Sequence, residues 1–162
     1  MTGATSFSLV LYELSGVNMN NLAAFPNPGR APTYATINIH NLRLRTFIGF
    51  NAEEMEKQQD VVINIEINYT LAESVLRDQV DDALNYKVIA KKVIGHVEEG
   101  RFLLLEKLVA DVLAICSDHP GVNHARVSID KPHALRFADS VSLSLEYQAD
   151  KAKTLRLLEK AS

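Results

Sequence analysis

The sequence predicts an α+β fold in which a four-stranded antiparallel sheet carries two helices on one face, in the chain order β-β-α-α-β-β. Apolar residues alternate with polar ones in four segments, two before and two after the middle of the chain, as in half-buried strands. Between these pairs the apolar period changes to that of two amphipathic helices. The composition, 162 residues of which 47% are hydrophobic and 23% charged, suits one globular domain, expected over residues 34–148.

Residues 1–33 are expected to form a flexible extension outside that domain. Residues 18–33 are rich in Asn, Pro and Ala and contain no periodic apolar face. The apolar run 7–14 is interrupted by Glu13, and no Lys or Arg precedes Arg30, so the run lacks the pattern of a secretory signal. No stretch approaches the ~20 apolar residues that span a bilayer. These features predict a cytoplasmic protein with no membrane partner.

The first two strands are predicted from alternating residues. Ile37 and Ile39 alternate with polar neighbours. Leu42 and Leu44 alternate in the opposite phase, which predicts a bulge or bend between the two pairs at His40–Asn41. The connection to the second strand is polar and contains three glutamates. The second strand is more regular, and its alternate residues are apolar or aromatic: Val61, Ile63, Ile65, Ile67 and Tyr69.

Two amphipathic helices are predicted in the middle of the chain. Asn85 is placed to cap the first helix and Gly100 to end it. The second helix follows after a very short turn, and the segment 118–121 (Asp-His-Pro-Gly) ends it. The apolar stripe of the first helix is Tyr86, Ile89, Ala90, Val93, Ile94 and Val97, and that of the second is Leu105, Leu108, Val109, Val112, Leu113 and Cys116.

Two further alternating strands complete the sheet, over residues 125–129 and 141–147. We expect the hairpin loop between them to span residues 131–139, which gather cationic and titratable side chains. Residues 149–162 have helical propensity and are expected to form a peripheral tail. An open sheet has two unpaired edges, so we expect several subunits to close edge to edge into a barrel.

Charge and motif content exclude several classes of function. Lys plus Arg number 17 and Asp plus Glu number 20, and this net charge of −3 argues against non-specific nucleic-acid binding. Cys116 is the only cysteine, so the chain has no intrachain disulfide and no cysteine-based metal cage. The five histidines include no H-x-H or H-E-x-x-H pair, and we expect neither a metal nor another cofactor. The sequence also lacks the common phosphate-loop and nucleophile-elbow motifs.

Four places carry candidate functional residues, and each also has a structural interpretation. Glu54 belongs to a glutamate-rich connection that could simply be a solvated loop. Glu106 lies in the first turn of the second helix, where the helix dipole alone favours an acid. Tyr86 opens the first helix and could be a core anchor. Lys131 and its neighbours could form a basic hairpin tip, or supply an acid or base.

Four separated motifs together resemble the dihydroneopterin aldolase family. They are Gly49-x4-Glu54-x4-Gln59, Leu84-Asn85-Tyr86, Leu104-Leu105-Glu106-Lys107-Leu108 and Asp130-Lys131-Pro132. They occur in the family's order over residues 37–147. The resemblance implies that residues 34–148 form a catalytic T-fold (tunnelling fold) domain. It also implies an oligomer, most simply an octamer of two stacked rings, with active sites between subunits.

The resemblance also implies a role for each motif residue. Glu106, with the backbone of Leu105, would hold the 2-amino and N3 edge of a pterin. Tyr86 would join the same pocket from a neighbouring subunit, and Glu54 would lie over its other side. Both would take part in catalysis as well as in substrate binding. Lys131 would be the general acid and base, and Gln59 would fix the glutamate loop. The pterin ring itself takes up the electrons of the broken bond, so this chemistry needs no metal or cofactor.

Within the family, the segment 133–136 (His-Ala-Leu-Arg) resembles the epimerase branch. That branch inverts C2′ of 7,8-dihydroneopterin triphosphate by a retro-aldol step followed by re-addition. Retention of the cleaved fragment needs a basic grip on its triphosphate, and the candidates by local charge are Arg43, Arg45, His133 and Arg136. Two alternatives remain open at this point: the aldolase of folate biosynthesis, which releases glycolaldehyde, and a non-catalytic pterin or purine binder.

Overall fold

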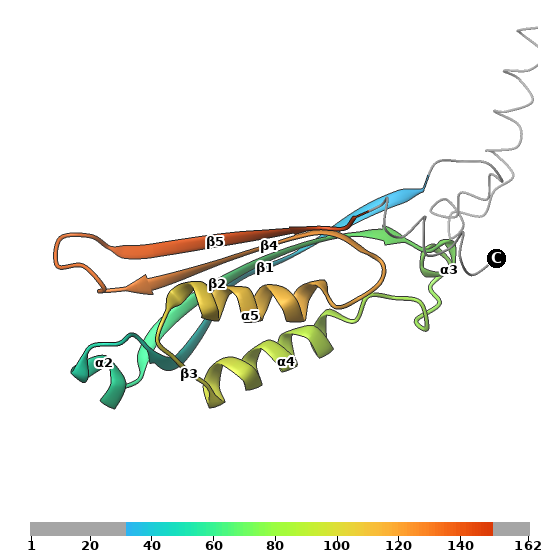
Figure 1. Ribbon diagram of the computed structural model, residues 1–162. Coiled ribbons are helices and arrows are strands. Elements are labelled where there is room, and N and C mark those ends of the chain that lie inside the picture. Colours follow the sequence, from blue (N-terminus) through green and yellow to red (C-terminus); the bar gives the residue numbers. More distant parts are fainter. Residues whose placement is uncertain (1–31, 151–162) are drawn as a thin grey trace, which may run out of the picture. The chain divides into compact units, whose positions relative to one another are not determined.

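The computed structural model describes residues 32–150, so most of the extension expected over residues 1–33 and of the tail expected over residues 149–162 lies outside the described residues (Figure 1). The chain divides into two compact units, and residues 71–83 belong to a different unit from residues 34–70 and 84–150. The elements are β1 (Thr33–Ile48), α2 (Ala52–Glu56), β2 (Gln59–Leu71), α3 (Glu73–Leu76), α4 (Tyr86–Glu99), β3 (Arg101–Phe102), α5 (Leu105–Ser117), β4 (Val122–Pro132) and β5 (Ser140–Gln148).

The sheet has the strand order β3-β1-β2-β4-β5. β2 and β4 pair antiparallel, as do β4 and β5. Contacts between β1 and β2 join Thr36 to Asn68 and Arg45 to Asp60, so these two strands also run in opposite directions. The four main strands and the α+β architecture are therefore as predicted.

The fifth strand, β3, was not predicted. It replaces the short turn expected between the two helices, and it pairs parallel to β1 through Phe47↔Arg101 and Ile48↔Phe102. Just beyond, the Gly49 backbone N–H donates to the Phe102 carbonyl at 2.9 Å. Two residues are too few to show alternation, so no sequence period indicates this strand. β3 thereby links the segment that leads into α5 with the end of β1.

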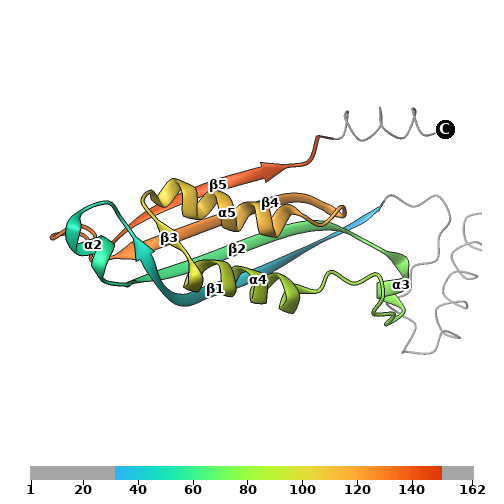
Figure 2. The same ribbon diagram turned by 60° about the horizontal axis from the view of Figure 1, so that its bottom comes forward.

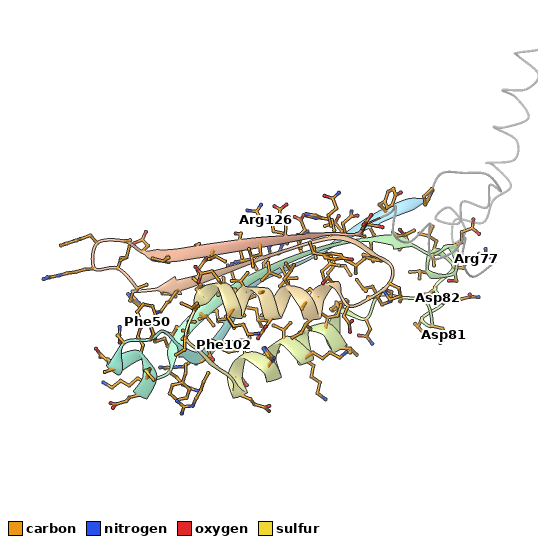
Figure 3. All side chains as sticks on the ribbon, viewed as in Figure 1. Phe50, Arg77, Asp81, Asp82, Phe102 and Arg126 are labelled. Carbon is orange, nitrogen blue, oxygen red and sulfur yellow. The ribbon has the colours of Figure 1, made fainter. Side chains whose placement is uncertain are left out.

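Both long helices cover one face of the sheet, and the core lies between them and the strands (Figure 2). The other face is polar: Arg126 of β4 points away from the helices and pairs with Glu146 at 3.7 Å (Figure 3). Among the described residues no helix is long and apolar enough to cross a membrane. Most of the buried apolar side chains belong to the predicted stripes: Val61, Ile63, Ile65 and Ile67 of β2, Ile89, Val93 and Val97 of α4, Leu108, Val109, Val112 and Cys116 of α5, and Ala125, Val127 and Ile129 of β4. Ile48, Leu84, Phe102 and Val122 are also buried, although no predicted stripe contains them.

The ends of α4 agree with the predicted caps. The Asn85 side chain accepts a hydrogen bond from the Val88 backbone N–H at 3.3 Å, and Gly100 is the C-terminal cap. Tyr86 begins the helix but is 51% exposed, so it is not a core anchor in the single chain. Within the helix the buried residues start at Ile89.

The predicted bend in β1 is present at Asn41. This residue has a φ of 54°, a left-handed conformation that Asn tolerates better than most residues. Its backbone N–H donates to the Asn64 side chain of β2 at 2.9 Å. The alternation of exposed and half-buried residues reverses at this point, which returns Leu42 and Leu44 to the core side of the sheet.

The expected boundary of the last hairpin loop was wrong by two residues. Lys131 and Pro132 lie in β4, where they pair with Val141 and Ser140 of β5. The ladder from β4 to β2 ends at Asp130, so the missing N–H of Pro132 leaves no bond to β2 unmade. The loop proper begins at His133, whose φ is 61°. Lys131 is therefore held by a strand, which fixes it better than a loop would.

Candidate functional site

Lys131 and Glu54 form an ion pair at one end of the sheet. The Lys131 ammonium donates a hydrogen bond to Oε1 of Glu54, across 77 residues of sequence. The side chains are only 11% and 21% exposed, respectively. Thr46 and Lys131 are the polar or charged residues that are buried among those described. A buried lysine that reaches a short acidic helix is unusual and marks this place as a candidate site.

The position of Glu54 is fixed by the cap of α2. The Asn51 side chain accepts from the Glu54 backbone N–H at 2.9 Å, and the Asn51 backbone N–H donates to Oε2 of Glu54 at 3.3 Å. Both carboxylate oxygens are therefore occupied. The hydrogen bond from Lys131 is the main reason why the pKa of Glu54 is lowered, against the opposing effect of burial. Glu54 is thus a carboxylate at neutral pH.

Gly49 leaves the space in which the Glu54 carboxylate lies. Its φ is 129°, a conformation that side chains rarely adopt. A Cβ at this position would lie 2.0 Å from Oε2 of Glu54. Only glycine therefore allows the end of β1 and the acidic helix to approach each other in this way.

Replacing Gly49 by alanine is expected to lower the free energy of unfolding by about 1–3 kcal/mol, because the new Cβ is strained and displaces Glu54. Gly95→Ala is the matched control. Gly95 lies within α4, where a Cβ meets nothing within 4 Å, so this change should raise the free energy by about 0.5–1 kcal/mol. Chemical denaturation of the two variants measures the difference, and equal effects would contradict the strained close approach at Gly49.

Gln59 supports the same end of the sheet. Its side-chain amide donates to the Ile48 carbonyl at 2.5 Å, which links the start of β2 to the end of β1. Glu54, Gln59 and His133 line one cavity of about 350 Å³, together with Asn51 and other residues of the α2 region. The structure therefore brings together Glu54, Gln59 and Lys131, three of the residues that the sequence motifs single out.

Three of the four basic candidates lie around a second hollow. Arg43, Arg45 and His133 line a cavity of about 740 Å³ that adjoins Pro132. His133 also lines the cavity beside Glu54. Arg45 is partly engaged, since it donates to the Gln58 carbonyl at 3.0 Å and pairs with Asp60 at 3.5 Å. Arg136 is not part of this lining; its guanidinium lies over the Phe137 ring at 5.6 Å.

Leu105 and Glu106 begin α5, and Glu106 is exposed. The preceding residue, Leu104, takes the N-cap position with no side-chain hydrogen bond. The side chain of the N-cap residue therefore leaves the backbone N–H groups of the first turn uncapped. An exposed carboxylate next to such a helix start can offer a flat ligand both acceptors and donors.

Tyr86 and Glu106 do not meet in one chain. α4 and α5 run antiparallel and touch through His96 and Asp111, whose side chains are 2.9 Å apart. Tyr86 and Glu106 lie on opposite sides of this contact along the helices. At 1.5 Å per residue, they are ~22 Å apart along the axis. A pterin ring bound by both residues would need them from two different chains.

Sequence analysis missed Asn51, although its signal was present. Asn51 and Glu54 have the spacing of a capping box, in which each side chain bonds the backbone of the other residue. Over residues 32–150, no group of three or more His, Cys, Asp or Glu side chains could hold a metal ion.

The main strands and helices follow one another in the order β-β-α-α-β-β, and both long helices cover one face of the sheet. This arrangement defines a T-fold protein. The chain belongs to the dihydroneopterin aldolase family, whose model, described as dihydroneopterin aldolase, matches residues 37–146. Both the resemblance inferred from the motifs and the fold that it implied are thus confirmed.

Relatives with two different names are similar to this chain. Dihydroneopterin triphosphate 2′-epimerase of Escherichia coli (strain K12) is 53% identical over 114 residues, 70% of this chain and 95% of that protein. The protein of the same name from Pseudomonas aeruginosa is 48% identical and covers 73% of this chain and 96% of its own length. The crystal structure of E. coli dihydroneopterin aldolase in complex with neopterin has a TM-score of 0.65 and 29% identity, over 70% of this chain and 98% of that chain. Identity to the named epimerases is well above identity to this aldolase.

Proposed function

We propose that the protein is an epimerase that inverts C2′ of 7,8-dihydroneopterin triphosphate to give 7,8-dihydromonapterin triphosphate. The observation that carries the proposal is the Lys131–Glu54 pair, which holds a proton-transfer group beside a cavity. The similarity to two proteins named for this epimerase supports the choice of substrate. The proposal also places the protein in the cytoplasm. The free, buried thiol of Cys116 is compatible with that reducing compartment.

The chemistry follows from the substrate. Protonation of N5 makes the dihydropterin ring an electron acceptor. Loss of the 2′-hydroxyl proton then lets the C1′–C2′ bond break, so that C2′ becomes an aldehyde and the bonding electrons enter the ring system. If the aldehyde fragment turns and C1′ attacks its other face, the same bond re-forms, both protons return, and C2′ is inverted. Lys131 is the general acid and base in this scheme: it takes up and returns the 2′-hydroxyl proton. Glu54 holds Lys131 in place.

Binding of the pterin falls to the start of α5. The Glu106 carboxylate matches two adjacent N–H donors on the pterin edge, an arrangement that gives strong paired hydrogen bonds. The Leu105 backbone, in the uncapped first turn, adds a donor beside it. Gln59 keeps the loop of Glu54 in position through the Ile48 carbonyl.

Aldolase cleavage is the second candidate function. It uses the same bond breaking but lets the fragment leave, and the family match favours it as at least a side activity. The test gives the purified protein dihydroneopterin triphosphate and, separately, dihydroneopterin, in buffer with a chelator. Chromatography then separates the two epimers from 6-hydroxymethyl-dihydropterin. Epimer as the main product from the triphosphate supports the proposal, cleavage as the main product supports the aldolase, and binding without turnover indicates a non-catalytic binder.

His133→Ala and Arg136→Ala are expected to raise KM for the triphosphate and to leave KM for dihydroneopterin unchanged, if these side chains hold the phosphates. Both variants should also form more cleavage product, because a loosely held fragment escapes before re-addition. The product ratio with each substrate is the measurement. Arg126→Ala on the opposite, polar face is the control for lost positive charge. An unchanged ratio in both variants would mean that other groups, such as Arg43 and Arg45, retain the fragment.

The proposed enzyme is a homo-oligomer, most simply an octamer, with sites between subunits. β5 forms one edge of the sheet, and β3 covers only two residues of β1 at the other, so long edges remain open for pairing. The ~22 Å axial separation of Tyr86 and Glu106 supports a site shared by two chains.

A mixing experiment tests the shared site. Tyr86→Ala and Glu106→Ala proteins, each nearly inactive, are unfolded together and refolded as mixed oligomers. Random assembly should restore about a quarter of the sites, because that fraction receives both intact residues. Recovered turnover is the measurement, and each variant refolded alone is the control. No recovery in oligomers shown to be mixed would mean that one chain supplies both residues.

A further inference from the structure

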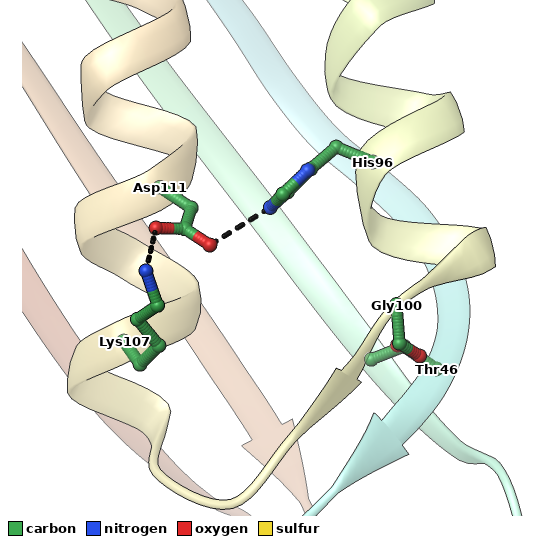
Figure 4. Close-up of polar contacts among 5 residues, drawn as sticks. All are labelled: Thr46, His96, Gly100, Lys107 and Asp111. Atoms are coloured by element: carbon green, nitrogen blue, oxygen red, sulfur yellow. Dashed lines mark hydrogen bonds and ion pairs between the residues drawn. The ribbon is translucent and has the colours of Figure 1, made fainter.

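Two side chains join the long helices between one and two turns beyond Glu106, the proposed pterin anchor. His96 of α4 hydrogen-bonds through Nε2 to Oδ2 of Asp111 on α5 at 2.9 Å, and Oδ1 of Asp111 accepts from Lys107 at 2.7 Å (Figure 4). The Lys107 hydrogen bond is the main cause of a lowered pKa for Asp111, with His96 contributing in the same direction. Asp111 is therefore a carboxylate that binds both neighbours, and the first turns of α5 are linked to α4 through it.

His96 also contacts the segment that leads into α5. Its ring lies 5.6 Å from the ring of Phe102, at an angle of 59°. The Phe102 ring packs against Gly100 so closely that a Cβ there would lie 2.4 Å from it. The hydroxyl of the fully buried Thr46 donates to the Gly100 carbonyl at 3.3 Å. Residues 100–102 are thus held by Thr46 of β1, which bonds Gly100, and by His96 of α4, which contacts Phe102.

The start of α5 needs this support because it lacks its own. Leu104 caps the helix without a side-chain hydrogen bond, and Leu103 and Leu104 are both more than half exposed. A helix start without a capping side chain is free to fray. Yet Leu105 and Glu106 must keep a fixed geometry if they are to bind a flat ring by paired hydrogen bonds.

We propose that His96 is a positioning residue for pterin binding, which acts through Asp111 and Phe102 to hold Leu105 and Glu106 in place. This inference rests on the proposed function. His96 does not touch the substrate in this arrangement. It secures the first turn of α5 from two directions: Asp111 fixes the helix, and Phe102 fixes the chain that enters it.

His96→Ala is expected to weaken the binding of neopterin about tenfold and to raise KM for the triphosphate by a similar factor, with kcat changed less than about threefold. His96→Gln should restore most of the affinity, since its amide can still donate to Asp111. Lys92→Ala, an exposed change on the same helix, is the control. The backbone N–H groups of residues 108–110 donate to the carbonyls of the first turn of α5, so their hydrogen exchange should rise in the alanine variant and return in the glutamine variant.

Three results would overturn the inference: unchanged neopterin affinity in His96→Ala, equal losses in the alanine and glutamine variants, or exchange at residues 108–110 that does not change. A wild-type protein that binds no neopterin would instead contradict the proposed function. The exchange measurement then still decides whether His96 holds the start of α5, so the two failures are distinguishable.

Discussion

Lys131→Ala is expected to lower kcat by ~10²–10⁴-fold while neopterin affinity changes by less than about threefold. The change removes the group that is proposed to move the proton, and it leaves untouched Glu106 and Leu105, the proposed pterin anchor. Steady-state kinetics with the triphosphate give kcat, and titration with neopterin gives the affinity. A kcat within tenfold of the wild type would exclude Lys131 as the acid and base.

Lys131→Arg is the matched control for the ion pair. Arginine keeps the positive charge beside Glu54 but does not release its proton in the physiological range. We therefore expect turnover as low as in the alanine variant, with a melting temperature closer to that of the wild type. If Lys131→Arg kept most of its activity, the residue would act through its charge and not through proton transfer.

Glu106→Ala is expected to weaken neopterin binding by about 100-fold, since a charge-assisted pair of hydrogen bonds is lost. Glu106→Gln keeps one acceptor without the charge and should fall between the alanine variant and the wild type. Titration with neopterin measures both. The purely structural role of this acid predicts a different result: a loss of about 0.3–1 kcal/mol in the free energy of unfolding, from the helix dipole, with affinity unchanged.

The sequence predicted the main elements because their signals are local. The stripes of α4 and α5 and the alternation in β2 extend over many residues, and Asn85 and Gly100 mark helix ends directly. The reversal of phase at Asn41 even located a bend within a strand. What failed was short or depended on a neighbour. β3 has two residues, and its existence depends on β1.

The candidate site was predictable as a set of residues but not as a geometry. Motif spacing singled out Glu54 and Lys131, yet only the fold brings them together across 77 residues. Lys131 lies in a strand because it pairs with Val141 of β5, and no local pattern of the sequence records this pairing. The distance between Tyr86 and Glu106 needed the antiparallel packing of two helices. This separation indicates that a ligand bound by both residues would need a second chain, which the motifs alone do not show.

The close approach of Gly49 to Glu54 also constrains how this sequence can change over generations. Any side chain at position 49 would overlap the carboxylate at position 54, so a lineage that keeps the glutamate in this rotamer must keep the glycine. A lineage that loses the glutamate is released from that requirement, because a shorter side chain vacates the space. The two positions should therefore covary, and a homologue with a bulkier residue at position 49 is expected to have given up the carboxylate that faces Lys131.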